Sequence, residues 1–185
     1  VIDSTIKKVQ DLSNLRGLVM AEVSDLDSLM DEIIRKYFID QSLLDRFHQK
    51  ITKKKEKSIK KILVNESEAC EKTCTLNWRQ FDINKLVDII DSSQKVKAIN
   101  ILLEWQKEQG NELYTSPNDK VFVENYNSDI IEVRNKLAHC SSVVENGKEI
   151  LKTRNGDLIF DTDRITEIRK KIREYHELFL KMQEL

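Results

Sequence analysis

The stretch Leu15–Ile33 reads LRGLVMAEVSDLDSLMDEI and carries apolar residues at three- and four-residue steps. This spacing places them on one side of a helix and predicts an amphipathic helix, which we extend from about Asp3 to Phe38. Glu22 falls within the apolar face, so its carboxylate is either solvated at the helix edge or buried and paired. An apolar face of this length needs partner helices, and the rest of the chain supplies them.

The same periodicity recurs along most of the 185 residues, and the chain has only four glycines and one proline to interrupt it. Asp40 and Asp82 stand where helix N-caps are expected. The pattern predicts further helices over Leu43–Val64, around Ser67–Cys74, from Asp82 through Ile90, over Val96–Trp105 with an end at Gly110, and from about Asp161 onward. We therefore predict an all-α helical bundle that forms a single domain over residues 1–185.

Two Asn-Gly pairs, Asn146-Gly147 and Asn155-Gly156, depart from this helical pattern. Asn-Gly favours tight hairpin turns, and short apolar runs flank both pairs. The sequence therefore predicts a small β-hairpin or three-strand meander at about residues 142–160, inserted before the last helix.

Composition indicates a soluble globular protein, with 39% hydrophobic residues, 34% charged residues and a net charge of −1. No apolar run reaches the ~18 residues of a membrane span, and no signal peptide is visible. Cys70, Cys74 and Cys140 have neither a disulfide framework nor the spacing of a zinc site. We expect a cytoplasmic location, no membrane contact, no metal and no cofactor.

Positive charge is concentrated between Lys50 and Lys61, where seven lysines occur. Such a run either contacts an RNA backbone or forms the solvated face of a helix. Two interpretations are also open for the aromatic residues Tyr114, Phe122 and Tyr126. They either stack on unpaired bases or pack in the core.

The stretch that indicates a possible catalytic site is Arg134-Asn135-Lys136-Leu137-Ala138-His139. It follows a predicted loop, Asn111–Asn127, in a segment expected to be helical over Ser128–Cys140, with Asp129 and Glu132 in capping-box register. Asn135 and His139 are one helical turn apart and share a face. Arg134 lies about 140° away from His139 around the helix, which favours a site where two helices meet.

These residue types suit RNA cleavage without a metal. His139 can exchange a proton near neutral pH, so it can activate the 2′-hydroxyl for attack on the adjacent phosphorus. Arg134 can stabilise charge on the phosphate, and Asn135 can hold either the histidine or the phosphate. Lys136 is a candidate substrate contact. The alternative is structural, because arginines on helices are commonly solvated and histidines are often satisfied at helix C-termini.

The segment Ile130–His139 resembles the motif helix of the HEPN superfamily, in which an arginine, often followed by asparagine, precedes a histidine by four to six residues. Its position also matches, late in a helical domain with one long helix to follow. Arg16–Glu22 resembles the first helix of stand-alone bacterial HEPN proteins.

The resemblance implies a HEPN-like helical bundle that dimerises through its motif helix, with Arg134 and His139 as the catalytic pair and Asn135 beside them. It also implies that Glu22 approaches the site. Many HEPN proteins are metal-independent endoribonucleases of toxin–antitoxin, abortive-infection or antiviral defence systems, so an RNA substrate and an antitoxin or regulatory partner are expected.

Two other interpretations stay open. The chain is alternatively a non-catalytic HEPN-like interaction or RNA-binding module of a larger defence system, or a structural helical protein whose motif is a coincidence. In one HEPN subgroup, a tyrosine two residues after the histidine accepts AMP, and this chain lacks that tyrosine. Ser141 occupies that position, so neutralisation by AMP transfer is not expected.

Overall fold

The first described helix, α2, spans Leu12–Tyr37, which agrees with the expected amphipathic helix over this part, and residues 3–11 of the expected helix lie outside the described residues. The structure is a computed structural model that describes residues 12–51, 59, 82–116, 121–139, 141–145, 148–153, 156–159 and 162–185. Most of these residues are helical, which confirms the predicted helical class. The predicted helix at Ser67–Cys74, most of the Lys50–Lys61 run and the three cysteines lie outside the described residues.

The described residues fall into two compact units. The first contains the chain up to Ser28 together with Ser116–Leu180, and the second contains Leu29–Thr115 and Lys181–Leu185. Helices α2 and α9 (Thr162–Glu184) each contribute residues to both units. None of the described helices has a stretch that is long and apolar enough to span a bilayer.

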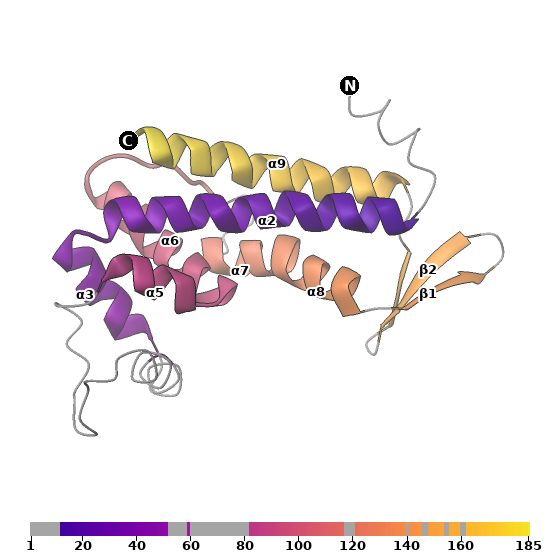
Figure 1. Cartoon of the computed structure of the whole chain (residues 1–185). Coiled ribbons are helices and arrows are strands. Elements are labelled where there is room, and N and C mark those ends of the chain that lie inside the picture. The colour runs from indigo at the N-terminus through magenta and orange to yellow at the C-terminus, as the bar shows by residue number, and fades with distance from the viewer. Residues whose placement is uncertain are drawn as a thin grey trace, which may run out of the picture. The chain divides into compact units, whose positions relative to one another are not determined.

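The first unit is built around one continuous helical segment, Phe122–His139, which we call the motif helix. It consists of α7 (Phe122–Tyr126), a π-helical turn, η2 (Asn127–Ile131), and α8 (Glu132–His139). The first part of α2 lies beside both α9 and the motif helix (Figure 1). The buried side chains that hold these helices together are Val19, Val23, Leu26, Phe122, Tyr126, Ile130, Val133, Leu137, Ile165, Ile168, Ile172, Tyr175, Leu178 and Phe179.

The motif helix begins earlier than the sequence predicts. The expected loop Asn111–Asn127 contains α7, because Phe122 and Tyr126 bury their rings against Tyr175 and Phe179 of α9. The expected capping box is wrong: Asp129 lies inside η2, and its carboxylate accepts a hydrogen bond of 3.1 Å from the Tyr175 hydroxyl. Tertiary packing therefore extends the helix beyond its predicted start.

A three-stranded antiparallel sheet follows the motif helix where the sequence predicts a hairpin or meander. Its strands are β1 (Ser141–Glu145), β2 (Lys148–Thr153) and β3 (Gly156–Ile159), in the order β1-β2-β3. Ile150 of the central strand pairs with Val143 on one side and Ile159 on the other. Asn146, Gly147 and Asn155 of the predicted turns lie outside the described residues.

The second unit contains the rest of α2, the end of α9 and three further helices: α3 (Gln41–Lys50), α5 (Ile83–Ile89) and α6 (Ser92–Glu108). The predicted N-caps Asp40 and Asp82 are confirmed, since both carboxylates accept backbone N–H bonds at a helix start. Gly110 has a φ of 88°, a left-handed conformation that glycine adopts without strain, and it follows the end of α6 as expected.

Replacing Asp40 with alanine is expected to lower the free energy of unfolding by about 1 kcal/mol, the usual cost of losing an N-cap. The Ser42 hydroxyl and the backbone N–H groups of Ser42 and Leu43 donate to Asp40 and lower the pKa of its carboxyl group. A lowered folded-state pKa gives stability that is present above the unfolded pKa and is lost as the pH falls through the folded one. Urea unfolding should therefore show the full difference at pH 7 and a shrinking one below about pH 4.

The matched control is Gln49→Ala on the exposed face of the same helix, which should change stability little at either pH. A difference between wild type and Asp40→Ala that does not vary with pH would contradict the capping role of the carboxylate.

Candidate functional site

Helix α8 presents the motif residues on different sides. Val133 and Leu137 are buried against the first unit's core, whereas Asn135 and His139 are exposed. The shared face predicted for Asn135 and His139 therefore points to solvent. The helix ends at His139, and the Arg16 guanidinium of α2 donates a hydrogen bond to the Leu137 carbonyl in its last turn. This contact fixes the end of α8 that carries the histidine.

Arg134 turns away from that exposed face toward α2. Its Nη1 lies 3.5 Å from Oδ2 of Asp27, and only 27% of the arginine side chain and 25% of the aspartate side chain are exposed. Its Nη2 also donates to the Asn135 carboxamide oxygen at 3.4 Å. Asn135 thus contacts the arginine, and Asp27 holds the guanidinium in a defined position beside α2.

His139 is exposed, and its imidazole makes neither a hydrogen bond nor an ion pair with any residue that the structure describes. It follows Arg134 by five residues, which separates them by about 7.5 Å along the helix and about 140° around it. Lys136 is half-exposed and likewise has no polar partner among the described residues. One copy of α8 therefore offers an anchored cation and, on a separate side, an accessible imidazole.

Glu22, the acid that the resemblance implies near the site, is paired instead with a cation of α9. The Arg169 Nε donates to its two carboxylate oxygens at 2.9 and 3.1 Å, and Nη2 donates at 2.6 Å. The acid beside Arg134 is instead Asp27, five residues further along α2. Five residues correspond to about 140° around a helix, so the two carboxylates flank the apolar stripe on opposite edges.

Sequence reasoning missed Asp27, although a signal was present. Asp27 follows Leu26 of the apolar stripe directly, so it stands at the border of the buried face, where a cation from a neighbouring helix can reach it. The sequence offers both Glu22 and Asp27 as border acids. Only the packing of α9 and α8 on the two edges decides which of them meets Arg134.

Arg169→Met is expected to lower the free energy of unfolding by about 2 kcal/mol, because it leaves the Glu22 carboxylate, 24% exposed, without its cation. Chemical denaturation measures the loss. The control is Arg164→Met on the same helix, whose pair with Glu167 is exposed and worth at most about 1 kcal/mol. Equal losses in the two variants would show that Glu22 and Arg169 do not form a structural pair.

The aromatic residues before the motif are part of the core. Phe122 and Tyr126 are 2% and 0% exposed, so neither ring is available to stack on a base. Tyr114 is half-exposed. The Tyr126 hydroxyl is buried without a hydrogen-bond partner among the described residues. Burial raises the pKa of Tyr126 well above its usual range, the Asp27 carboxylate adds to the increase, and Arg134 acts in the opposite direction.

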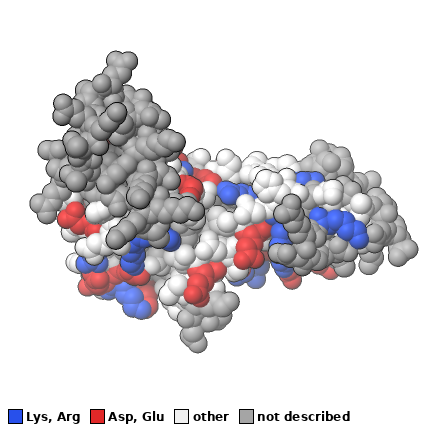
Figure 2. Space-filling model, turned by 90° about the horizontal axis from the view of Figure 1, so that it is seen from below, with Lys and Arg blue, Asp and Glu red and all other residues white. Residues whose placement is uncertain are grey.

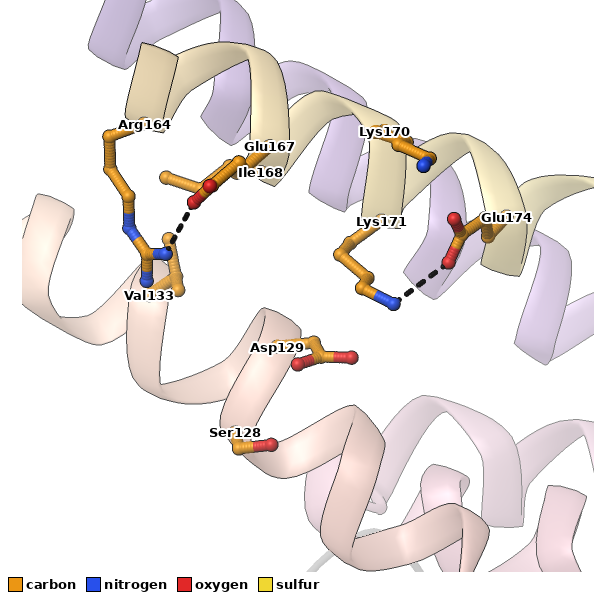
Figure 3. Close-up of a pocket in the computed structure, with 9 residues that line it drawn as sticks. All are labelled: Ser128, Asp129, Val133, Arg164, Glu167, Ile168, Lys170, Lys171 and Glu174. Carbon is orange, nitrogen blue, oxygen red and sulfur yellow. Dashed lines mark hydrogen bonds and ion pairs between the residues drawn. The ribbon is translucent and has the colours of Figure 1, made fainter. Parts of the chain in front are cut away.

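A cleft of about 310 Å³ borders the motif helix on its α9 side. Arg164 and Lys171 reach from α9 toward Val133 and Asp129, and each cation is paired with a glutamate of its own helix (Figure 3). The cleft therefore carries charges of both signs, with Val133 and Ile168 as its apolar lining residues. Among the described residues on the face shown in Figure 2, acidic and basic side chains are also interspersed. Among the residues that line the cleft, Arg164, Lys170 and Lys171 are balanced by Asp129, Glu167 and Glu174, so the cleft does not favour an anionic ligand by charge alone.

Within the described residues, no three His, Cys, Asp or Glu side chains cluster closely enough to hold a metal ion. None of the protein-family models, curated proteins or solved structures compared with this chain matches it. The function is therefore inferred from the site residues and from the resemblance of their pattern.

Proposed function

We propose that this protein is a metal-independent endoribonuclease of HEPN type that acts as a homodimer. The observation that carries the proposal is the arrangement on α8, where Asp27 anchors Arg134 and His139 stands exposed one and a half turns later. A guanidinium and an imidazole are the two groups that the reaction requires.

The reaction exchanges one phosphorus–oxygen bond for another. His139 accepts the proton of the 2′-hydroxyl, and the 2′-oxygen attacks the adjacent phosphorus. Arg134 stabilises the additional negative charge on the phosphate oxygens. The bond to the 5′-oxygen then breaks, and that oxygen takes up a proton from an imidazolium or from water. The products are a 2′,3′-cyclic phosphate and a 5′-hydroxyl.

The dimer follows from the separation of the two groups within one chain. Arg134 is directed toward α2, whereas His139 is exposed on another side of α8. If two copies of α8 pack antiparallel about a two-fold axis, the arginine of one copy lies near the histidine of the other. The exposed Asn135 and His139 supply the surface for that contact. Lys136, half-exposed on the same helix, is a candidate contact for the RNA backbone.

The resemblance to HEPN proteins further suggests a role in bacterial defence or as a toxin, in the cytoplasm and under the control of an antitoxin or another regulator. Expression of the active protein in a bacterial host should then slow growth, and expression of His139→Ala should not.

The direct test is incubation of the purified protein with a panel of single-stranded RNAs in EDTA. Cleavage that leaves 2′,3′-cyclic phosphate ends, identified by mass spectrometry, is the expected result. If all RNAs remain intact and expression of the protein leaves growth unchanged, the nuclease proposal is wrong.

The second candidate is a non-catalytic HEPN-like interaction module, favoured by the ion pair that partly neutralises Arg134. A protein of this kind would bind RNA or a protein partner without cleaving RNA. Light scattering separates the two candidates further, since the nuclease requires a dimer and the module does not.

A further inference from the structure

We propose that Arg16 of α2 positions His139 by capping the end of α8. Arg16 is then a positioning residue, because it acts on the reaction through the last turn of the helix and touches neither the RNA nor the reacting groups. The catalytic part of this inference rests on the proposed nuclease function, whereas the capping of the helix does not.

The end of α8 needs a hydrogen-bond donor from outside the helix. The last carbonyl groups of an α-helix have no N–H partner within the helix itself. The carbonyl of Leu137 belongs to this last turn, and the Arg16 guanidinium donates a hydrogen bond to it. A cation at a helix C-terminus also interacts favourably with the helix dipole. The contact therefore satisfies a carbonyl at the helix end and adds a favourable charge interaction.

The position of His139 depends on this turn. It is the last residue of α8, two residues and about 3 Å beyond Leu137 along the helix axis. Leu137 is buried, but Ala138 and His139 after it are exposed, so core packing does not hold the turn beyond Leu137. The imidazole makes neither a hydrogen bond nor an ion pair with any described residue. Fraying of the last turn would therefore displace the imidazole from the 2′-hydroxyl.

The same face of α2 also holds the other group of the proposed site. Arg16 and Asp27 are eleven residues apart, which corresponds to about three turns and an offset of only about 20° around the helix. Asp27 pairs with Arg134 at 3.5 Å, and Arg16 holds the end of α8 at Leu137. One helix thus fixes both groups within the chain. Such precision matters, because a misplacement of about 1 Å can slow a reaction by about 10²-fold.

Amide hydrogen exchange, followed by NMR, tests the cap without any assay of activity. In Arg16→Met, the amides of Leu137, Ala138 and His139 are expected to exchange about tenfold faster, because a hydrogen bond from a charged donor is lost. Amides of α7, at the other end of the motif helix, should exchange as in the wild type. Arg16 is half-exposed near the start of α2, so the substitution should not unfold the protein.

Two further variants keep the exchange experiment specific. Arg16→Lys should restore most of the protection, since a lysine can also donate to the last carbonyls of a helix. Arg173→Met removes an exposed arginine of α9 in the same unit and should change no amide of α8. Equal exchange rates at the end of α8 in the wild type and in Arg16→Met would overturn the inference.

The kinetic readout separates positioning from a contact with RNA. Arg16→Met should lower kcat about tenfold with little change in KM, and Arg16→Lys should recover most of the loss. In a His139→Ala background, Arg16→Met should have no further effect, either on the residual rate or on the rate with free imidazole as the base. If Arg16 instead binds a phosphate, Arg16→Met will slow both backgrounds equally, raise KM and weaken the salt dependence of binding. This result contradicts the positioning role.

The two readouts distinguish a failure of the cap from a failure of the nuclease. Faster exchange at the end of α8 in a protein that cleaves no RNA refutes the nuclease and supports the cap. Unchanged exchange in Arg16→Met of a protein that does cleave RNA refutes the cap and supports the nuclease.

Discussion

His139→Ala is expected to slow RNA cleavage by about 10²- to 10⁴-fold, the usual contribution of a general acid or base. The substitution removes the proton acceptor for the 2′-hydroxyl and leaves every other group in place. Because the imidazole is exposed and contacts no described residue through a hydrogen bond or ion pair, its loss should not unfold the protein. Single-turnover cleavage of a labelled RNA measures the rate, and circular dichroism checks the fold.

His176→Ala is the matched control, since His176 is half-buried on α9 in the same unit. It should retain the wild-type rate. If His139→Ala cleaves RNA as fast as the wild type does, the activity belongs to another group or to a contaminant, and the assignment of α8 as the site fails. Addition of EDTA should change neither the wild-type rate nor the ratio between the variants.

The second large effect is expected from mixing two inactive variants, Arg134→Ala and His139→Ala. If each site takes its arginine from one chain and its histidine from the other, a mixed dimer contains one intact site. Random exchange of subunits makes half of the dimers mixed, each with one intact site of two, so activity should return to about one quarter of the wild-type value. The measurement is RNA cleavage after co-refolding or co-expression of the two chains.

The control for this experiment is a mixture of His139→Ala with an Arg134→Ala/His139→Ala double variant, which should stay inactive at every ratio. The mixture of the two single variants could also stay inactive although mixed dimers form. In that case, the arginine and the histidine of a site would belong to the same chain. This result would contradict the two-chain site and leave open a site within one chain.

The predictability of the fold varies from element to element for physical reasons. The periodicity of Leu15–Ile33 is sufficient to predict α2, and Asp40 and Asp82 mark helix starts because N-capping is a local interaction. The start of the motif helix is not predictable in this way. Phe122 and Tyr126 stand in a segment with loop-like composition, and contacts with α9 make it helical.

In the candidate site, too, some features are predictable from the local sequence and others depend on tertiary packing. Arg134, Asn135 and His139 can be recognised from their types and spacing, and regular helix geometry already separates Arg134 from His139. Which acid meets Arg134 depends on which helix packs on which edge of α2, and the residues around Glu22 and Asp27 carry no information on that point. The π-helical turn is equally hidden, because a local sequence pattern does not distinguish it from a regular helical turn.

The helical class, the position of α2, the caps of α3 and α5, and the residue types that could act on a phosphate can all be predicted from the sequence without the structure. These features depend on interactions within a few residues of each other. That Glu22 pairs with Arg169 and that Asp27 pairs with Arg134 follows from the tertiary structure alone. Each of these results depends on how residues more than 90 positions apart in the chain pack together, and local propensities do not encode such packing.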